Sequence, residues 1–109
     1  MAVGGVMTSL KTAVPVDEQA IIRFCERWRI KELALFGSVL TDEFRADSDV
    51  DVLLTFDDPT RWSLFDVVDM KDELERLFGR KVDVVEKAAI RNPWRRKSIL
   101  ASYQVIYAA

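Results

Sequence analysis

The stretch LFGS at residues 35–38, followed ten residues later by DVDVLL at residues 49–54, decides the fold of this chain. An apolar run ends at a Gly-Ser turn, a charged loop follows, and a second apolar run opens with alternating aspartates. Because successive side chains of a strand point to opposite faces, Asp49 and Asp51 share one face of the second strand. Two neighbouring carboxylates repel each other, so this pair costs stability unless a cation lies between them.

Periodicity on either side of this stretch predicts an α/β (α+β) chain with a small mixed sheet flanked by helices. We expect a flexible N-terminus over residues 1–14 and a single domain over residues 15–109. The expected helices run from Asp17 to about Trp28, from Ser63 to Phe78, and from Asn92 to about Leu100. The expected strands cover residues 33–36, 50–56 and 81–86, and a short helical turn is expected over residues 39–44. The apolar tail at residues 105–107 is left without an assigned state.

The second helix carries its own start and stop signals. Ser63, followed three residues later by Asp66, predicts a capping box, and Gly79 predicts a C-terminal cap. Its apolar stripe is expected to consist of Leu64, Val67, Val68, Leu74 and Leu77. Five further aromatic residues could belong either to the core or to a partner surface: Trp62, Phe65, Trp94, Tyr103 and Tyr107.

Composition excludes several classes of function. The net charge of −2 argues against a duplex-DNA binder, although it permits a nucleotide ligand held by a local positive patch. The absence of histidine excludes histidine-based acid–base, nucleophilic or metal-ligand schemes. The single cysteine, Cys25, cannot form an internal disulfide, which with no signal peptide predicts a reducing cytoplasm. No run reaches the ~20 apolar residues of a spanning helix, so we expect no membrane association.

Three aspartates are expected to converge on one face of the sheet. Asp83 has the same strand parity as Asp49 and Asp51, so the three carboxylates meet if the second and third strands are neighbours. Hard oxygen ligands of this kind suit Mg²⁺, with Mn²⁺ as an alternative. Two such ions can hold the attacking and leaving oxygens of an in-line displacement, while a third carboxylate can accept the proton of an attacking hydroxyl.

The Gly-Ser turn supplies groups that suit a phosphate. Gly37 allows the backbone to approach a phosphate closely, and Ser38 offers a hydroxyl donor. Arg45 could neutralise phosphate charge, and Ser48 could bond the loop backbone or orient Asp49. Together with the aspartates, these residues indicate phosphoryl or nucleotidyl transfer from a metal-bound nucleoside triphosphate.

Each of these features also has a plain structural interpretation. A lone Gly-Ser turn is usually only a turn, an Asp-x-Asp pair usually faces solvent, and Asp83 alone is usually a surface charge. Arg45 could equally be a solvated loop residue. The basic run at residues 91–97 is most often a solvated helix face, with a nucleotide or partner contact as the alternative. The joint occurrence of the carboxylates on matched strand faces favours a site.

The pattern Gly37-Ser38, ten residues, Asp49-Val50-Asp51 resembles the signature of the DNA polymerase beta-type nucleotidyltransferase superfamily. Asp83 resembles the third carboxylate of that family, and the resemblance covers about residues 33–86. Small size and the segments at residues 63–66 and 91–93 look most like the minimal nucleotidyltransferases (MNT), which commonly act as antitoxins to HEPN-domain ribonuclease toxins. The resemblance implies the nucleotidyltransferase fold.

The resemblance also implies roles for individual residues. Gly37 and Ser38 would hold the triphosphate, Asp49 and Asp51 would bind both Mg²⁺ ions, and Asp83 would complete one metal site and help activate the attacking hydroxyl. It implies transfer of AMP from ATP to a tyrosine hydroxyl of the toxin, within a hetero-oligomer. Arg45 and Ser48 match common family positions, whereas Val39 and Asp42 stand where many members carry arginine and glycine.

Two other functions remain open from the sequence. A non-catalytic antitoxin could neutralise its toxin by binding alone. A small-molecule nucleotidyltransferase is the third reading, although such enzymes usually carry an added helical domain.

Overall fold

The computed structural model describes residues 6–7, 17–40 and 48–109. Three α-helices lie in these ranges: α1 (Glu18–Arg27), α2 (Leu64–Phe78) and α3 (Pro93–Ala101). The strands there are β1 (Val6–Met7), β2 (Ile30–Phe36), β3 (Val50–Phe56), β4 (Val82–Glu86) and β5 (Tyr103–Ala108). Short 3-10 helices follow β2 (Gly37–Leu40) and β4 (Lys87–Ala89).

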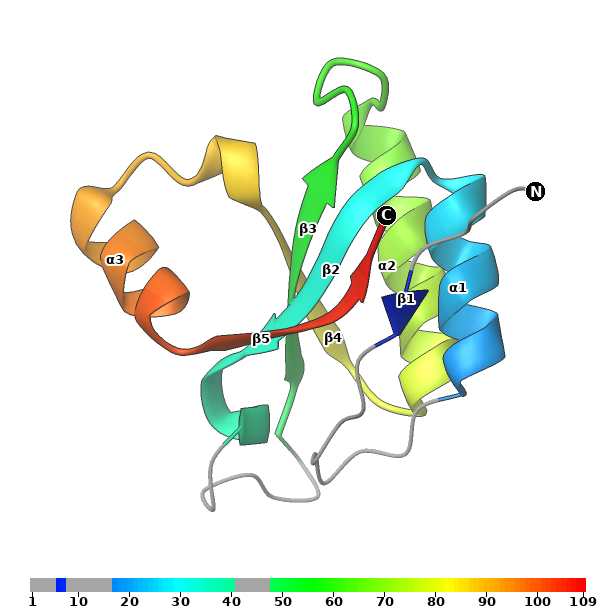
Figure 1. The fold of residues 1–109 in the computed structure, drawn as a ribbon, viewed down its shortest axis with the longest axis horizontal. Coiled ribbons are helices and arrows are strands. Elements are labelled where there is room, and N and C mark those ends of the chain that lie inside the picture. Colours follow the sequence, from blue (N-terminus) through cyan, green and yellow to red (C-terminus); the bar gives the residue numbers. More distant parts are fainter. Residues whose placement is uncertain (1–5, 8–16, 41–47) are drawn as a thin grey trace.

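Within the described ranges the strands form one five-stranded mixed sheet in the order β1-β5-β2-β3-β4. Neighbouring strands are antiparallel except for β3 and β4, which run parallel and are joined by α2. Figure 1 shows α1 and α2 on one side of the sheet and α3 on the other. The sheet is therefore covered on both faces, as an α/β layer structure requires.

Capping residues set the start of α1 and both ends of α2. The Asp17 side chain caps α1 by accepting a bond from the Ala20 amide at 3.2 Å. The predicted capping box is confirmed: the Ser63 amide donates to Asp66 at 2.8 Å, and the Asp66 amide donates back to the Ser63 hydroxyl at 3.3 Å. Gly79 ends α2 with a φ of 71°, in the left-handed region that favours glycine.

The core lies mainly between the sheet and the pair α1 and α2. Val50, Val52 and Leu54 of β3 are fully buried there, as their shared parity predicts. On the opposite face a smaller apolar cluster joins the sheet to α3, and its buried members are Ala34, Phe36, Leu53 and Ile99. The aspartates of β3 and β4 belong by parity to this second face, so α3 and the site share one side of the sheet.

The predicted stripe of α2 is partly wrong. Leu74 is buried, but Leu64 is 79% exposed and Val68 is 50% exposed. At roughly 100° per residue, Val68 lies about 120° around the helix from Leu74, beyond the face that meets the sheet. Met70 and Phe78 complete the buried face instead.

The five aromatic residues left open by the sequence separate clearly. Tyr107 is buried in the main core, whereas Phe65 is 84% exposed and Trp94 is 79% exposed. Trp62 is half-buried and meets Trp28 edge-to-face with ring centres 5.0 Å apart, and Tyr103 is half-buried beside the smaller cluster. Trp28 packs at the edge of the main core, and its indole nitrogen donates to the Glu73 carboxylate at 3.3 Å.

The C-terminal segment 103–108 forms a strand that the sequence left unassigned. Strand β5 lies between β1 and β2 and is drawn in red in Figure 1. Of the N-terminal segment predicted to be flexible, Val6 and Met7 pair with β5, and the rest lies outside the described residues. No helix in the described ranges is long and apolar enough to cross a membrane.

Candidate active site

Two of the three predicted carboxylates occupy opposed positions on the parallel strands. Asp51 of β3 is the register partner of Asp83 of β4, so the expectation that these strands are neighbours is confirmed. Asp49 immediately precedes β3 and shares the parity of Asp51. Asp49 and Asp83 are exposed, whereas Asp51 is half-buried. Three acidic residues therefore gather around the start of the parallel pair.

The end of β2 lies against the same carboxylate. Phe36 is the register partner of Asp51, and Gly37 follows with a φ of 77°. A Cβ added to Gly37 would collide with the Asp51 carboxylate oxygen and would lie 3.3 Å from its Cγ. Only glycine combines this backbone conformation with so close an approach. The Gly-Ser turn and the aspartates thus form one site, as their spacing predicts.

The charge balance of the site is unfavourable for Asp51. Burial contributes most to raising its pKa above the ordinary value, and the neighbouring charges of Asp83 and then Asp49 raise it further. The positive charge of Arg95 acts in the opposite direction and lowers the pKa. A bound cation would offset these unfavourable effects and stabilise the ionised form of Asp51.

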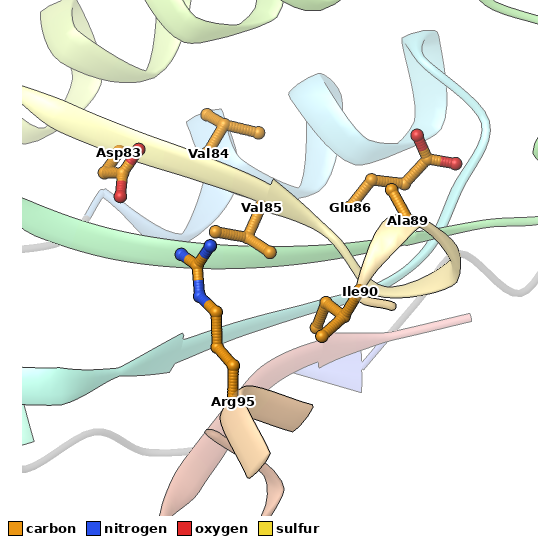
Figure 2. Close-up of a pocket in the computed structure, with 7 residues that line it drawn as sticks. All are labelled: Asp83, Val84, Val85, Glu86, Ala89, Ile90 and Arg95. Carbon is orange, nitrogen blue, oxygen red and sulfur yellow. The ribbon is translucent and has the colours of Figure 1, made fainter. Parts of the chain in front are cut away.

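Arg95 is the site residue that the sequence did not single out. It lies on α3, and Figure 2 shows its side chain extending from the helix toward β4, on the side of Asp83 and Val85. The basic run at residues 91–97 indicated that a cationic side chain could reach a site. That pattern could not distinguish Arg95 from its basic neighbours, because the residue that reaches the site depends on how α3 folds back over the sheet.

One backbone bond and one side-chain bond fix the start of β3 beside β4. The Val50 amide donates to the Lys81 carbonyl at 2.9 Å, and the Arg80 guanidinium donates to the Ser48 carbonyl at 3.3 Å. Asp49 lies between these two attachment points. In the structure, the Ser48 carbonyl therefore anchors the end of the loop. The predicted role of the Ser48 hydroxyl stays a prediction.

Two other predicted site residues are described less fully. Ser38 lies in the 3-10 helix Gly37–Leu40, which begins two residues earlier than the expected helical turn. Arg45 and Asp42 lie outside the described residues, as does the rest of that turn. The phosphate-binding roles of Ser38 and Arg45 stay predictions.

The donor set fits a metal that is completed by a substrate. Among residues 6–7, 17–40 and 48–109, no three acidic or cysteine side chains form a group that could hold a metal ion alone. Mg²⁺ does not need such a cage, because it usually binds through one or two carboxylates together with water and substrate phosphates. Asp49, Asp51 and Asp83 are oxygen donors of the required kind beside a turn that can approach a phosphate.

Residues 18–106 match the family model of the nucleotidyltransferase domain, and the chain belongs to this family. It is 35% identical over 74 residues to a Methanocaldococcus jannaschii protein provisionally named a protein adenylyltransferase, covering 68% of this chain and 74% of the relative. The protein adenylyltransferase MntA of Thermococcus cleftensis is 36% identical over 67 residues, or 62% of this chain and 66% of the relative. The predicted family is confirmed.

Solved structures confirm the nucleotidyltransferase fold. A structure provisionally described as a minimal nucleotidyltransferase is 34% identical and superposes with a TM-score of 0.64, covering 79% of this chain and 85% of its own. A toxin–antitoxin crystal structure with AMP-PNP superposes at 0.70 with 16% identity, covering 86% and 75%. A complex of a tri-AMPylated Shewanella oneidensis HEPN toxin with its MNT antitoxin superposes at 0.62 with 15% identity, covering 84% and 70%. The last two likenesses concern the fold alone.

Proposed function

We propose that this chain is a Mg²⁺-dependent nucleotidyltransferase that transfers AMP from ATP to a tyrosine hydroxyl of a HEPN ribonuclease toxin, and so acts as an antitoxin. The observation that carries the proposal is the register of Asp51 opposite Asp83, with the Gly37 backbone against the Asp51 carboxylate. The relatives named as protein adenylyltransferases support a protein as the acceptor, and the similar fold of an MNT antitoxin in complex with an AMPylated HEPN toxin supports the class of partner.

The chemistry is an in-line displacement at the α-phosphorus of ATP. A bond forms between the tyrosine oxygen and the α-phosphorus, while the bond to the bridging oxygen of the β-phosphate breaks and pyrophosphate leaves. The phenolic proton passes to a nearby carboxylate, for which the exposed Asp83 is the candidate, because Asp49 and Asp51 would hold the cation. Mg²⁺, when bound, would neutralise charge on the phosphates.

The protein's contribution is alignment and charge. Asp49 and Asp51 would hold the cation, and the Gly37 turn would let the phosphates lie against the backbone. The positive charge of Arg95 would offset part of the negative charge that the substrate brings. Positioning and electrostatic stabilisation are the main means by which proteins accelerate phosphoryl transfer. We place this activity in the cytoplasm, since a buried free cysteine such as Cys25 suits a reducing compartment.

A mass measurement tests the proposal. Purified protein is incubated with Mg²⁺, ATP and its cognate toxin, and the toxin is weighed by intact-protein mass spectrometry. We expect a mass increase of one AMP group per modified tyrosine for the wild type and none for Asp49→Asn/Asp51→Asn. Asp72→Asn, an exposed carboxylate on α2, serves as the matched control and should behave as the wild type.

Protection from the toxin separates catalysis from binding. If the double variant neutralises the toxin as well as the wild type does, the chain acts by binding alone and the catalytic proposal is wrong. If the double variant binds the toxin but fails to silence its ribonuclease activity, transfer of AMP is required for neutralisation.

A further inference from the structure

Arg80 reaches from the segment before β4 to the chain just before Asp49. Its guanidinium donates to the Ser48 carbonyl at 3.3 Å, and the residue is half-buried. Arg80 and Ser48 each precede by two residues the first register pair of the parallel strands, which is Val82 and Val50. The Arg80 side chain therefore supplies a cross-strand bond beyond the first register pair.

The three carboxylates of the candidate site are not held equally. Asp51 and Asp83 lie within β3 and β4 and are register partners, so the pairing of the strands fixes the backbone of both. Asp49 lies one residue before β3 and is exposed. The end of an element opens more readily than its interior. The position of Asp49 therefore depends on contacts outside the strand pairing.

Such contacts lie on both sides of Asp49. The Val50 amide, which follows it, donates to the Lys81 carbonyl at 2.9 Å, and the Ser48 carbonyl, which precedes it, accepts from Arg80. Both partners belong to the two residues that lead into β4. With its backbone held on either side by this segment, Asp49 is kept in a fixed relation to the strand that carries the third carboxylate.

The segment that carries Arg80 is itself held by α2. The Gly79 amide donates to the Glu75 carbonyl at 2.9 Å, and the Val82 amide donates to the Glu75 carboxylate at 3.0 Å. Arg80 lies between these two attachment points, so its side chain extends from an anchored backbone. Its guanidinium is planar with five donors in a fixed arrangement, which suits a directed bond to a carbonyl.

We infer that Arg80 is a positioning residue for the candidate metal site: its bond to the Ser48 carbonyl holds Asp49 where it can share a cation with Asp51. The inference rests on the proposed function, in which these two aspartates hold the cation. Groups that orient a metal ligand without touching the metal typically change metal affinity or activity by roughly 10–100-fold when they are replaced. We expect the lower end of this range, because the Val50 amide bond remains.

The sign of the effect separates positioning from charge. Arg80 is positive, and removing a positive charge near a cation site tightens cation binding by Coulomb's law. Removing a support of Asp49 weakens cation binding instead. A loss of affinity on replacing Arg80 is therefore opposite to the change that charge alone produces.

Mn²⁺ binding measures the effect without relying on catalysis. Mn²⁺ is titrated into the protein, and the free ion is counted by electron paramagnetic resonance. Arg80→Met, which removes every donor but keeps an unbranched side chain, should raise the Kd of Mn²⁺ about 10-fold. Arg76→Met, the same replacement at an exposed position on α2, should keep the wild-type Kd. An unchanged or lower Kd in Arg80→Met would overturn the inference.

Arg80→Lys keeps the positive charge and a donor in a less directed form. It should raise the Kd by a smaller factor than Arg80→Met does, and it carries the test if Arg80→Met does not fold, as judged by urea unfolding. A Kd equal to that of the wild type in Arg80→Lys, together with a raised Kd in Arg80→Met, is the rescue expected of a hydrogen-bonding role. Equal losses in both variants would contradict that role.

A double-mutant cycle shows whether Arg80 acts through Asp49. Asp49→Asn alone should weaken Mn²⁺ binding, and adding Arg80→Met should weaken it no further, because the carboxylate that Arg80 positions is already gone. A second loss of about 10-fold in the Asp49→Asn background would show that Arg80 supports the site as a whole, and would overturn the specific role.

AMP transfer to the toxin separates this inference from the proposed function. Arg80→Met should need about 10-fold more Mn²⁺ than the wild type for its half-maximal rate, in line with its Kd. If the wild type neither binds Mn²⁺ nor transfers AMP, the proposed function is wrong. If the wild type does both and Arg80→Met has the same dependence on Mn²⁺, only the role of Arg80 is lost.

Discussion

Asp51 and Asp83 lie directly opposite each other on the parallel strands β3 and β4. The pairing of these two strands is sufficient to bring Asp51 and Asp83, which are far apart in the chain, side by side on one face of the sheet. The arrangement raises the free energy of the unliganded protein, because burial and two neighbouring negative charges both disfavour the ionised form of Asp51.

Gly37→Ala and Gly79→Ala form a matched pair. Both glycines have positive φ, at 77° and 71°, so alanine costs about 1–2 kcal/mol of backbone strain at either position. A Cβ at Gly79 would meet no described atom within 4 Å, whereas one at Gly37 would strike the Asp51 carboxylate. Urea denaturation should therefore show a larger loss for Gly37→Ala, and AMP transfer should fail in that variant only. Equal losses of stability and activity would contradict the close approach.

Asp51→Asn should stabilise the metal-free protein at neutral pH. The pKa of Asp51 is raised in the folded state, so folding favours its protonated form and stability falls as pH rises through the folded pKa. Below its ordinary pKa of 3.8 the wild type and variant should unfold at similar urea concentrations, and above it the variant should unfold at a higher concentration. A wild type that is the more stable of the two at pH 7 would speak against the charge crowding.

Glu75→Gln should have the opposite dependence on pH. The Glu75 carboxylate accepts from the Val82 amide at 3.0 Å, and this bond contributes most to lowering its pKa. Its contribution to stability is present above the ordinary pKa of 4.5 and is lost as pH falls through the folded pKa. Urea midpoints should separate wild type from variant at pH 7 and converge at low pH. Lys71→Gln, which removes only the ion pair at 3.3 Å, should cause a smaller change.

Leu74→Ala and Leu64→Ala apply one substitution at two depths of the same helix. Leu74 is fully buried, so its truncation should cost about 2–5 kcal/mol of unfolding free energy. Leu64 is 79% exposed, and its truncation should change stability by no more than about 0.5 kcal/mol. Thermal and urea unfolding would measure both. A comparable loss for Leu64→Ala would place that side chain in the core, as the apolar pattern alone had suggested.

Local signals predicted most of the fold correctly. Strand β3 was predicted at residues 50–56 because the segment is rich in β-branched and apolar residues. Helix α2 was predicted from Ser63, Asp66 and Gly79 because caps act within one turn. Strand β5 was not predicted, since it acquires its identity by pairing with β2, whose partner residues lie about 70 positions earlier. The sequence of a six-residue segment does not by itself reveal a pairing partner so far away in the chain.

The residues of the candidate site likewise include some that the sequence predicted and one that it did not. Parity on two strands was sufficient to bring Asp51 and Asp83 together, and Gly37 was implied by the turn before them. Arg95 required the path of the chain after β4, because a helix end can present any of several basic residues to a sheet. The cavity that Arg95 lines is likewise a product of that path rather than of any motif.

The position of β5 has a consequence for how the protein is made. Residues 103–108 fill the space between β1 and β2, so the N-terminal strand has no neighbour in the sheet until this segment has left the ribosome. The sheet that carries the aspartates is then completed only after nearly all of the described chain has been synthesised. Synthesis halted before Tyr103 would leave β2 with an open edge, so interrupted translation would release an unfinished sheet instead of a smaller working enzyme.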